Sequence, residues 1–212
     1  MRMWTAVIPV KRLRAAKTRL RGAVPADRHP ELALAMVRDT AAAVLSADAV
    51  AGLLVVSDDP EVGAAVRDLG ARVVPDPGGG LNAAMRFGAD ETAGPAAHRV
   101  VLAGDLPALR PEQLDDVLSR ATTRSFVPDA AGIGTVLLAA PAWQPLDPRF
   151  GGPSAASHAA SGAVPLTGSW PGLRQDVDTA ADLATVLTLG AGRCTCGLLR
   201  DIGMTPECAP AA

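Results

Sequence analysis

The chain has 212 residues and a net charge of −2, with 20 basic against 22 acidic side chains, so it suits one domain without a basic coat for nucleic acid. Apolar residues make up 49% and aromatic residues only 3%, which predicts a globular core of Ala, Val and Leu and excludes long disorder and base-stacking surfaces. No apolar run approaches the roughly 20 residues of a membrane span and no leader-like segment precedes residue 4, so we expect a cytoplasmic protein without membrane contacts.

The first part of the chain alternates between apolar runs and amphipathic segments. Four runs are typical of buried parallel strands: residues 4–10, 52–57, 71–75 and 100–103. Helices are expected over residues 27–47, 60–70, 81–92 and 111–121. Asp27 is a plausible cap of the first helix, and proline opens the second and the fourth. This alternation predicts right-handed βαβ units and an open, mainly parallel sheet with helices on both faces.

After residue 125 the pattern changes to shorter segments, which we expect to form an antiparallel excursion near the sheet edge. The elements expected there are strands over 125–127 and 134–140, a small helix after Pro153, a short strand before Asp176 and a helix over 179–189 capped by Thr179. No repeat or linker divides the chain. We therefore expect a single domain over residues 1–212, with a peripheral tail from about residue 190.

All three cysteines, Cys194, Cys196 and Cys208, lie within the last twenty residues. They are too close together and too odd in number to indicate a disulfide framework. A structural zinc site needs four ligands, and the three histidines lie elsewhere in the chain. The sequence therefore favours an ordinary reduced C-terminal segment over a structural or redox role.

The loop after the first strand is dense in positive charge. Of the 20 cationic side chains only Lys11 and Lys17 are lysines, and both lie in this loop, near Arg19. A lysine offers a compact charge with three donors, which suits a polyphosphate that moves during a reaction. The alternative is a solvated run of charges. The chain has neither a Walker loop nor a dinucleotide-binding glycine fingerprint.

Acidic residues follow two of the expected strands, where ligands of open α/β sheets bind. Asp105 comes directly after a buried run, behind Gly104, which permits close backbone approach. Asp176 and Asp178 alternate along an extended segment, so both lie on one face and repel each other unless a cation lies between them. The three acids together predict a site for one or two Mg²⁺ ions. Alternatively, Asp105 caps the helix that begins at Pro111, and Asp178 caps the last helix.

Two glycine-rich segments, residues 132–135 (GIGT) and 150–154 (FGGPS), complete the candidate loops. Glycines followed by Pro-Ser at a helix start expose backbone N–H groups and a hydroxyl, which is an arrangement that binds anions. The same sequence also occurs in ordinary turns.

With these loops together, the chain resembles the guanylyltransferases of coenzyme F420 biosynthesis, which act on 2-phospho-L-lactate or, in actinobacteria, on phosphoenolpyruvate. The resemblance extends from about residue 4 to 189, through the segments IPVKRLRAAKTRL, LNAAM, LAGDLP, GIGT, FGGPS and DVDT. It implies a three-layer, Rossmann-like fold of the glycosyltransferase-A-type nucleotidyltransferases, with a mixed, mainly parallel sheet. It also implies GTP as donor and a three-carbon phosphorylated acid as acceptor.

The resemblance carries over to individual residues. It implies magnesium binding by Asp105, Asp176 and Asp178, and acceptor binding by Thr135, Gly151 and Ser154. We expect Lys17 to neutralise the triphosphate and the leaving pyrophosphate, with Lys11 and Arg19 assisting. The nucleotide is expected to lie along Pro9, Val10 and Asp105, with the amide of Asn82 reading the guanine edge.

The implied reaction is attack by the acceptor's phosphate oxygen on the α-phosphorus of GTP, with release of pyrophosphate. The Ala- and Arg-rich composition is typical of a GC-rich source. Since the actinobacterial members of the family that the chain resembles act on phosphoenolpyruvate, the resemblance favours this acceptor over 2-phospholactate. A labile product would favour transient contact with the next transferase of the pathway. The alternatives are a molybdenum-cofactor, sugar-phosphate or 3-phosphoglycerate-specific nucleotidyltransferase, and a non-catalytic nucleotide-binding module.

Overall fold

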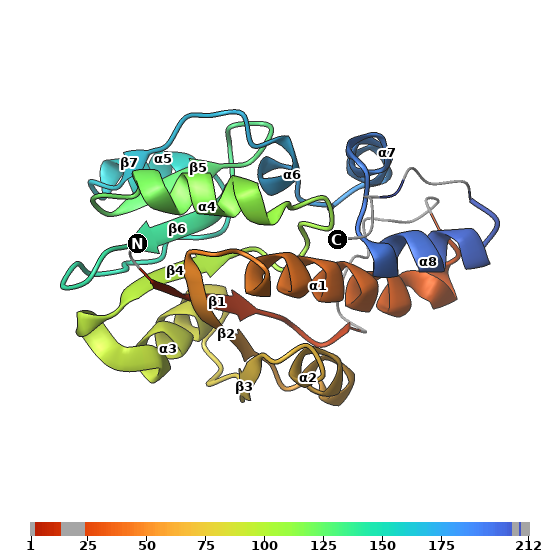
Figure 1. Ribbon diagram of the computed structural model, residues 1–212, viewed down its shortest axis with the longest axis horizontal. Coiled ribbons are helices and arrows are strands. Elements are labelled where there is room, and N and C mark those ends of the chain that lie inside the picture. The colour runs from red at the N-terminus through yellow and green to blue at the C-terminus, as the bar shows by residue number, and fades with distance from the viewer. Residues whose placement is uncertain (1–2, 14–23, 205–207, 209–212) are drawn as a thin grey trace.

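A seven-stranded sheet forms the centre of the protein, shown in Figure 1 as a computed structural model that describes residues 3–13, 24–204 and 208. The strands are β1 (Trp4–Pro9), β2 (Val50–Val56), β3 (Arg72–Val74), β4 (His98–Leu102), β5 (Ser125–Pro128), β6 (Thr135–Ala140) and β7 (Val164–Pro165). Their order is β3-β2-β1-β4-β6-β5-β7. Strands β1 to β4 pair in parallel, whereas β6 runs antiparallel to both β4 and β5. The expected parallel sheet and its antiparallel excursion are both confirmed.

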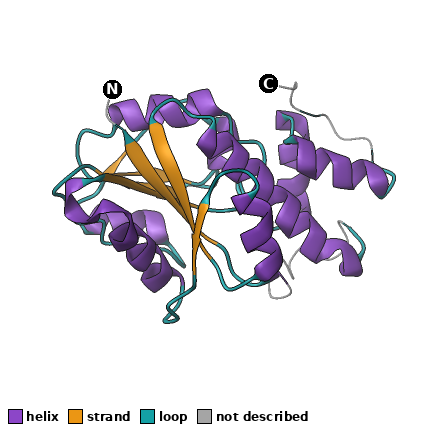
Figure 2. Cartoon of the chain, turned by 60° about the horizontal axis from the view of Figure 1, so that its bottom comes forward, coloured by secondary structure: helices purple, strands orange, loops and turns teal. Residues whose placement is uncertain are grey.

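Helices cover the two faces of this sheet, as Figure 2 shows. The α-helices are α1 (His29–Leu45), α2 (Pro60–Arg67), α3 (Leu81–Ala93), α4 (Pro111–Arg120), α5 (Ser154–Ala160), α6 (Pro171–Arg174), α7 (Ala180–Leu189) and α8 (Arg193–Asp201); short 3-10 turns are η3 (Ala26–Arg28) and η4 (Gly94–Ala96). Helices α1, α2, α4 and α6 pack on one face, and α3 and α5 on the other. Among the described helices none is long and apolar enough to cross a bilayer.

The alternation of side chains along β1 produces this three-layer arrangement. Ala6 and Ile8 join the core beneath α1, while Val7 between them joins the core beneath α3. Helix α3 approaches the sheet closely at Gly88, where an added Cβ would lie 2.6 Å from Val7 and 2.7 Å from Val56. Because both faces of β1 are covered, the strand is apolar throughout, as parallel strands are.

Two expected elements differ from the structure. Asp27 does not cap the first helix, because it lies within η3 and the cap position of α1 is Arg28, which makes no side-chain cap bond. The short strand expected before Asp176 is also wrong. That stretch contains α6, which proline at its first turn favours, and the only short strand nearby in the described residues is β7, paired with β5 at the sheet edge.

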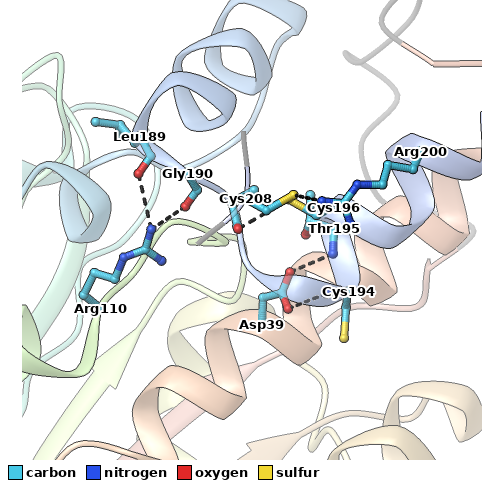
Figure 3. Close-up of a disulfide and its surroundings, with 10 residues drawn as sticks. Asp39, Arg110, Leu189, Gly190, Cys194, Thr195, Cys196, Arg200 and Cys208 are labelled. Carbon is cyan, nitrogen blue, oxygen red and sulfur yellow. Dashed lines mark hydrogen bonds between the residues drawn. A yellow bond between two sulfur atoms is a disulfide. The ribbon is translucent and has the colours of Figure 1, made fainter. Parts of the chain in front are cut away.

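The described part of the segment after residue 190, residues 191–204 and 208, packs against the rest of the chain. It contains α8, which lies against α1 and buries Cys196, Leu198 and Leu199 in a third core cluster; the Thr195 side chain is buried as well. The carboxylate of Asp39 in α1 accepts hydrogen bonds from the backbone N–H groups of Cys194 and Thr195, at 2.9 and 2.8 Å (Figure 3). Asp39 in α1, which is far from α8 in the sequence, therefore caps the first turn of α8.

The expectation of a wholly reduced C-terminal segment is also wrong, because Cys196 and Cys208 form a disulfide (Figure 3). A parallel bridge between Ala191 and Cys208 brings the two cysteines together, with their Cα atoms 5.9 Å apart. This separation lies within the range that a disulfide spans. The spacing of cysteines along the chain does not show this, since it depends on how the tail folds back.

Thiol labelling tests the disulfide directly. In denaturant without reductant we expect one cysteine, Cys194, to be alkylated, because it is the free thiol beside the disulfide. After reduction all three cysteines should be labelled. As a control, the Cys208→Ser variant should expose two thiols, Cys194 and Cys196, before any reduction. Intact-mass measurement of three alkylated thiols in the unreduced protein would contradict this pairing.

Candidate functional site

A cavity of about 570 Å³ opens beyond the carboxyl ends of β1 and β4. This is the edge at which parallel α/β sheets bind ligands, and the volume lies in the range of small-molecule sites. Nine of the residues singled out from the sequence line it: Pro9, Val10, Lys11, Asp105, Thr135, Gly151, Ser154, Asp176 and Asp178. Segments from five separate parts of the chain therefore meet in one cavity.

The loop after β1 starts in a fixed position beside this cavity. The backbone N–H of Val10 continues the sheet by donating to the carbonyl of Val56, at 2.9 Å. The N–H of Leu13 donates to one carboxylate oxygen of Asp59, also at 2.9 Å. The other oxygen of Asp59 caps α2. One carboxylate thus ties the loop to the neighbouring helix.

The residues expected to bind the nucleotide fall into three groups. Lys11 is exposed at the cavity, whereas Lys17 and Arg19 lie outside the described residues. Asn82 does not line the cavity. Its amide nitrogen donates to the carbonyl of Phe150 at 2.9 Å, and its amide oxygen accepts from the N–H of Phe150 at 2.7 Å. The structure therefore gives Asn82 the role of anchoring the loop at residues 150–152 to α3.

The backbone around Asp105 is held on both sides. The carbonyl of Asp105 accepts a hydrogen bond from the N–H of Val177, at 3.2 Å, so residues 176–178 lie directly beside it. The next N–H, of Leu106, donates to the hydroxyl of Thr40 in α1, at 3.0 Å. Thr40 is fully buried. The first bond joins the two acidic segments, which about seventy positions separate in the sequence, and the second ties the loop to α1.

The acids interact electrostatically. Burial and the neighbouring carboxylates of Asp105, Asp178 and Asp129 raise the pKa of Asp176 to about 7. Neither Asp105 nor Asp178 is a helix cap, since α4 is preceded by Arg110 and α7 by Thr179. The structure thus excludes both capping alternatives and leaves the two carboxylates in the cavity lining.

The described side chains do not form a complete metal centre by themselves. Within residues 3–13, 24–204 and 208, no three acidic, histidine or cysteine side chains are arranged to hold a metal ion. Mg²⁺, however, usually binds one or two carboxylates and completes its coordination with water and substrate phosphates. The hard oxygen donors and the raised pKa of Asp176 fit such a shared site. That all three acids ligate metal stays a prediction.

One wall of the cavity is built from glycine-rich backbone. Gly151 and Gly152 have φ angles of +105° and +54°, in the left-handed region that favours glycine. Thr135 is the first residue of β6, and Ser154 is the first residue of α5. The N–H of Ala155 donates to the carbonyl of Ile133, at 3.0 Å, which joins the two loops. Backbone N–H groups and two hydroxyls are therefore available on this wall.

Asp129 is a site residue that the sequence interpretation missed. Its two carboxylate oxygens accept from the N–H groups of Ile133 and Gly134, at 2.9 and 2.8 Å, and it lines the cavity. An aspartate a few residues before a glycine-rich turn is a known signal for such backbone capping. Asp129 therefore shapes the turn that leads to Thr135.

The Gly134→Ala variant tests this turn. An added Cβ would lie 2.4 Å from the carboxylate of Asp129, so the turn must shift. We expect a loss of about 1–3 kcal/mol in unfolding free energy and a higher KM for the acceptor. Urea unfolding and steady-state kinetics measure both. Gly52→Ala, where nothing lies within 4 Å of the added Cβ, is the control, and equal effects of the two variants would contradict the assignment.

Fold comparison defines the class of protein. The structure is similar to a nucleotidyl transferase from Methanothermobacter, with a TM-score of 0.61 and 22% identity over 95% of this chain and 100% of that one. It is also similar to 4-diphosphocytidyl-2C-methyl-D-erythritol synthase, with a TM-score of 0.58 and 17% identity over 89% and 98% of the two chains. The fold is that of the nucleotidyltransferases, and the acids and glycine-rich wall lie at the sheet edge where this fold binds ligands.

Sequence comparison gives the family. Residues 4–163 match the family model described as "Guanylyl transferase CofC like", and the chain belongs to this family. It is 58% identical over 195 residues to a phosphoenolpyruvate guanylyltransferase of Salinispora arenicola, covering 90% of both chains. It is 54% identical over 207 residues to the enzyme of the same name from Geodermatophilus obscurus, covering 94% of this chain and 95% of that one. The chain is thus a nucleotidyltransferase, as the sequence motifs predicted.

Proposed function

We propose that this enzyme transfers GMP from GTP to phosphoenolpyruvate and releases pyrophosphate, as a step of coenzyme F420 biosynthesis. The observation that carries the proposal is that the acidic residues and the glycine-rich segments line one cavity, in a chain more than half identical to two enzymes named for this activity. The alternative nucleotidyltransferases and the non-catalytic module have no comparable support.

The nucleotide occupies the side of the cavity formed by β1 and α3. Pro9, Val10 and Lys11 line this side together with Leu81 and Met85. Apolar side chains contact a purine ring well, and the adjacent exposed lysine suits its phosphates. Lys17 neutralises the triphosphate and the leaving pyrophosphate, and Lys11 and Arg19 assist, as the sequence predicts.

The acceptor acid binds on the glycine-rich wall. Thr135 and Ser154 supply hydroxyls there, and the left-handed backbone at Gly151 and Gly152 lets main-chain N–H groups approach an anion closely. The bound acceptor lies between these groups and the carboxylates of Asp105 and Asp176. Its phosphate is then directed at the α-phosphorus of GTP.

Charge makes a divalent cation part of this proposal. Of the described lining residues four are acidic, Asp105, Asp129, Asp176 and Asp178, whereas Lys11 is basic. Two anionic substrates do not enter such a cavity unless positive charge accompanies them. We propose that Asp105 and the carboxylates of Asp176 and Asp178 hold Mg²⁺. When bound, Mg²⁺ supplies charge neutralisation of the phosphates.

The chain needs no general base for this reaction. A phosphate monoester has its second pKa near 6, so the acceptor oxygen is already mostly ionised at pH 7. Consistent with this, the cavity lining includes no histidine among the described residues. The task of the side chains is to orient two anions in line and to exclude water.

The experiment is a pyrophosphate-release assay with GTP and Mg²⁺. Phosphoenolpyruvate, 2-phospholactate and 3-phosphoglycerate are compared as acceptors, and ATP, CTP and UTP are compared as donors. The highest kcat/KM is expected for GTP with phosphoenolpyruvate, and turnover should stop when EDTA is added. Both proposed substrates are intracellular metabolites, so we also propose a cytoplasmic location. Preference for another acid or another nucleotide would contradict the proposal.

A further inference from the structure

His158 in α5 contacts two parts of the glycine-rich wall, where we propose that the acceptor binds. It is fully buried, and its ring Nδ1 lies 2.9 Å from the hydroxyl oxygen of Thr135. Its ring Nε2 accepts a hydrogen bond from the backbone N–H of Arg149, at 3.0 Å. The ring also packs edge-on against Phe150, with centroids 5.0 Å apart. His158 does not line the cavity, so its influence on a ligand passes through these neighbours.

The contacts determine which ring nitrogen carries the proton. A backbone N–H only donates, so Nε2 of His158 must present its lone pair to Arg149. Burial lowers the pKa of His158 to about 4, with the Ser154 carbonyl opposing and the charges of Arg124, Asp147 and Arg149 also nearby. The ring is therefore neutral at neutral pH. A neutral ring with an unprotonated Nε2 carries its proton on Nδ1.

This tautomer fixes the direction of the hydrogen bond to Thr135. Since Nδ1 carries a proton, it donates to the hydroxyl oxygen and cannot accept from it. The hydroxyl proton of Thr135 must find another acceptor, and the described residues provide none besides His158 itself. Thr135 lines the cavity, so that proton is available to a ligand there. With the opposite tautomer, the hydroxyl would donate to the ring and show only lone pairs to an anion.

We propose that His158 is a positioning residue that makes the Thr135 hydroxyl a hydrogen-bond donor to an anionic oxygen of the acceptor acid. The proposal rests on the proposed function, because it takes the acceptor to be an anion bound on this wall. The bond from Arg149 has a second effect. It fixes Arg149 at the start of the loop at residues 150–152, next to Phe150, which Asn82 holds.

Two amide variants separate the two bonds of His158. In His158→Asn the amide nitrogen takes the place of Nδ1, so the donor to Thr135 is kept and the acceptor for Arg149 is lost. In His158→Gln the longer side chain reaches the place of Nε2, so the acceptor is kept and the donor is lost. We expect His158→Gln to raise the acceptor KM by about 10- to 100-fold. His158→Asn should change it by less than about threefold.

The KM for GTP should be unchanged in His158→Gln, which a general loss of folding would not produce. In a Thr135→Val background, His158→Gln should cause no further rise in the acceptor KM. Equal KM effects of the two amide variants, a larger effect of His158→Asn, or full additivity with Thr135→Val would each overturn the proposal.

The tautomer is also measurable in the unaltered protein, without any risk of misfolding. Nitrogen-15 NMR of labelled histidine should show His158 with a protonated Nδ1 and an unprotonated Nε2 at neutral pH. The opposite tautomer or an imidazolium ring would overturn the proposal. This result does not depend on the acceptor's identity. If the wild-type enzyme fails to use phosphoenolpyruvate, the proposed function fails, and the variants are then compared with whichever acid supports turnover.

Discussion

The Asp105→Asn variant is expected to lose at least about 1000-fold in kcat while keeping its fold. Asparagine matches the shape of aspartate, and the bonds that hold this loop, from Val177 to the Asp105 carbonyl and from Leu106 to Thr40, do not involve the carboxylate. The variant removes the negative charge that we propose to hold a cation against the phosphates. Pyrophosphate release at saturating substrates measures kcat, and circular dichroism measures the fold.

A matched control for Asp105→Asn is available on the same molecule. Asp90 is exposed on α3 and lies outside the cavity lining, so Asp90→Asn should retain the wild-type kcat. Retention of activity by Asp105→Asn would reject the metal assignment of this residue. Loss of activity together with loss of the circular dichroism signal would instead show a structural role.

The Asp176→Asn variant is expected to be less active but more stable than the wild type. The ionised form of Asp176 is disfavoured in the fold, because burial and the Asp105 and Asp178 carboxylates raise its pKa to about 7. Removing this charge removes the repulsion from the folded state. It also removes a proposed metal ligand, so we expect kcat to fall by about 100-fold or more.

The gain in stability should depend on pH with a definite sign. The carboxyl group ionises near pH 3.9 in the unfolded chain and near pH 7 in the folded one. Below about pH 4 it is protonated in both states and contributes nothing. As the pH rises from about 4 to 7, the unfolded chain releases a proton that the fold retains, so wild-type stability falls. The difference between Asp176→Asn and wild type should therefore be absent at low pH and largest above about pH 7.

Thermal unfolding measures this difference. Allowing for solvent screening at a partly exposed group, we expect about 1–2 kcal/mol at about pH 8, which corresponds to about 3–6 °C in Tm. Asp68→Asn, at an exposed aspartate after α2, should show no such pH-dependent gain. Addition of Mg²⁺ with GTP should stabilise the wild type more than Asp176→Asn. A variant less stable than wild type at about pH 8 would contradict the electrostatic interpretation.

Much of the fold follows from local patterns. The apolar runs that became β1, β2 and β4 are long enough to be recognised, and Pro60 and Pro111 mark helix starts because proline suits the first turn. The errors fall where local signals are short. The four-residue helix α6 and the two-residue strand β7 are formed by packing at the edge of the sheet rather than by their own propensity.

The site shows the same division. Asp105, Asp176 and Asp178 were expected to lie together because they follow segments that end at one edge of the sheet, and the structure places all three in the lining of one cavity. Their binding of a metal ion stays a prediction. Thr40 and Asp129 were missed, since their functions are to accept or hold backbone groups of other segments. Asn82 was assigned to guanine, whereas in the structure its amide holds the loop at Phe150.

The amino-acid sequence by itself determined the alternating strands and helices, the acidic and glycine-rich loops, and the resemblance to one enzyme family. These features depend on local periodicity, turn chemistry and short motifs, all of which are written in neighbouring residues. Only the tertiary structure decided that Cys196 meets Cys208, that α8 is capped by Asp39, and that His158 contacts the hydroxyl of Thr135. Each of these contacts joins residues that are not neighbours in the sequence. Their geometry is set by the packing of the whole chain, so local sequence patterns do not reveal them.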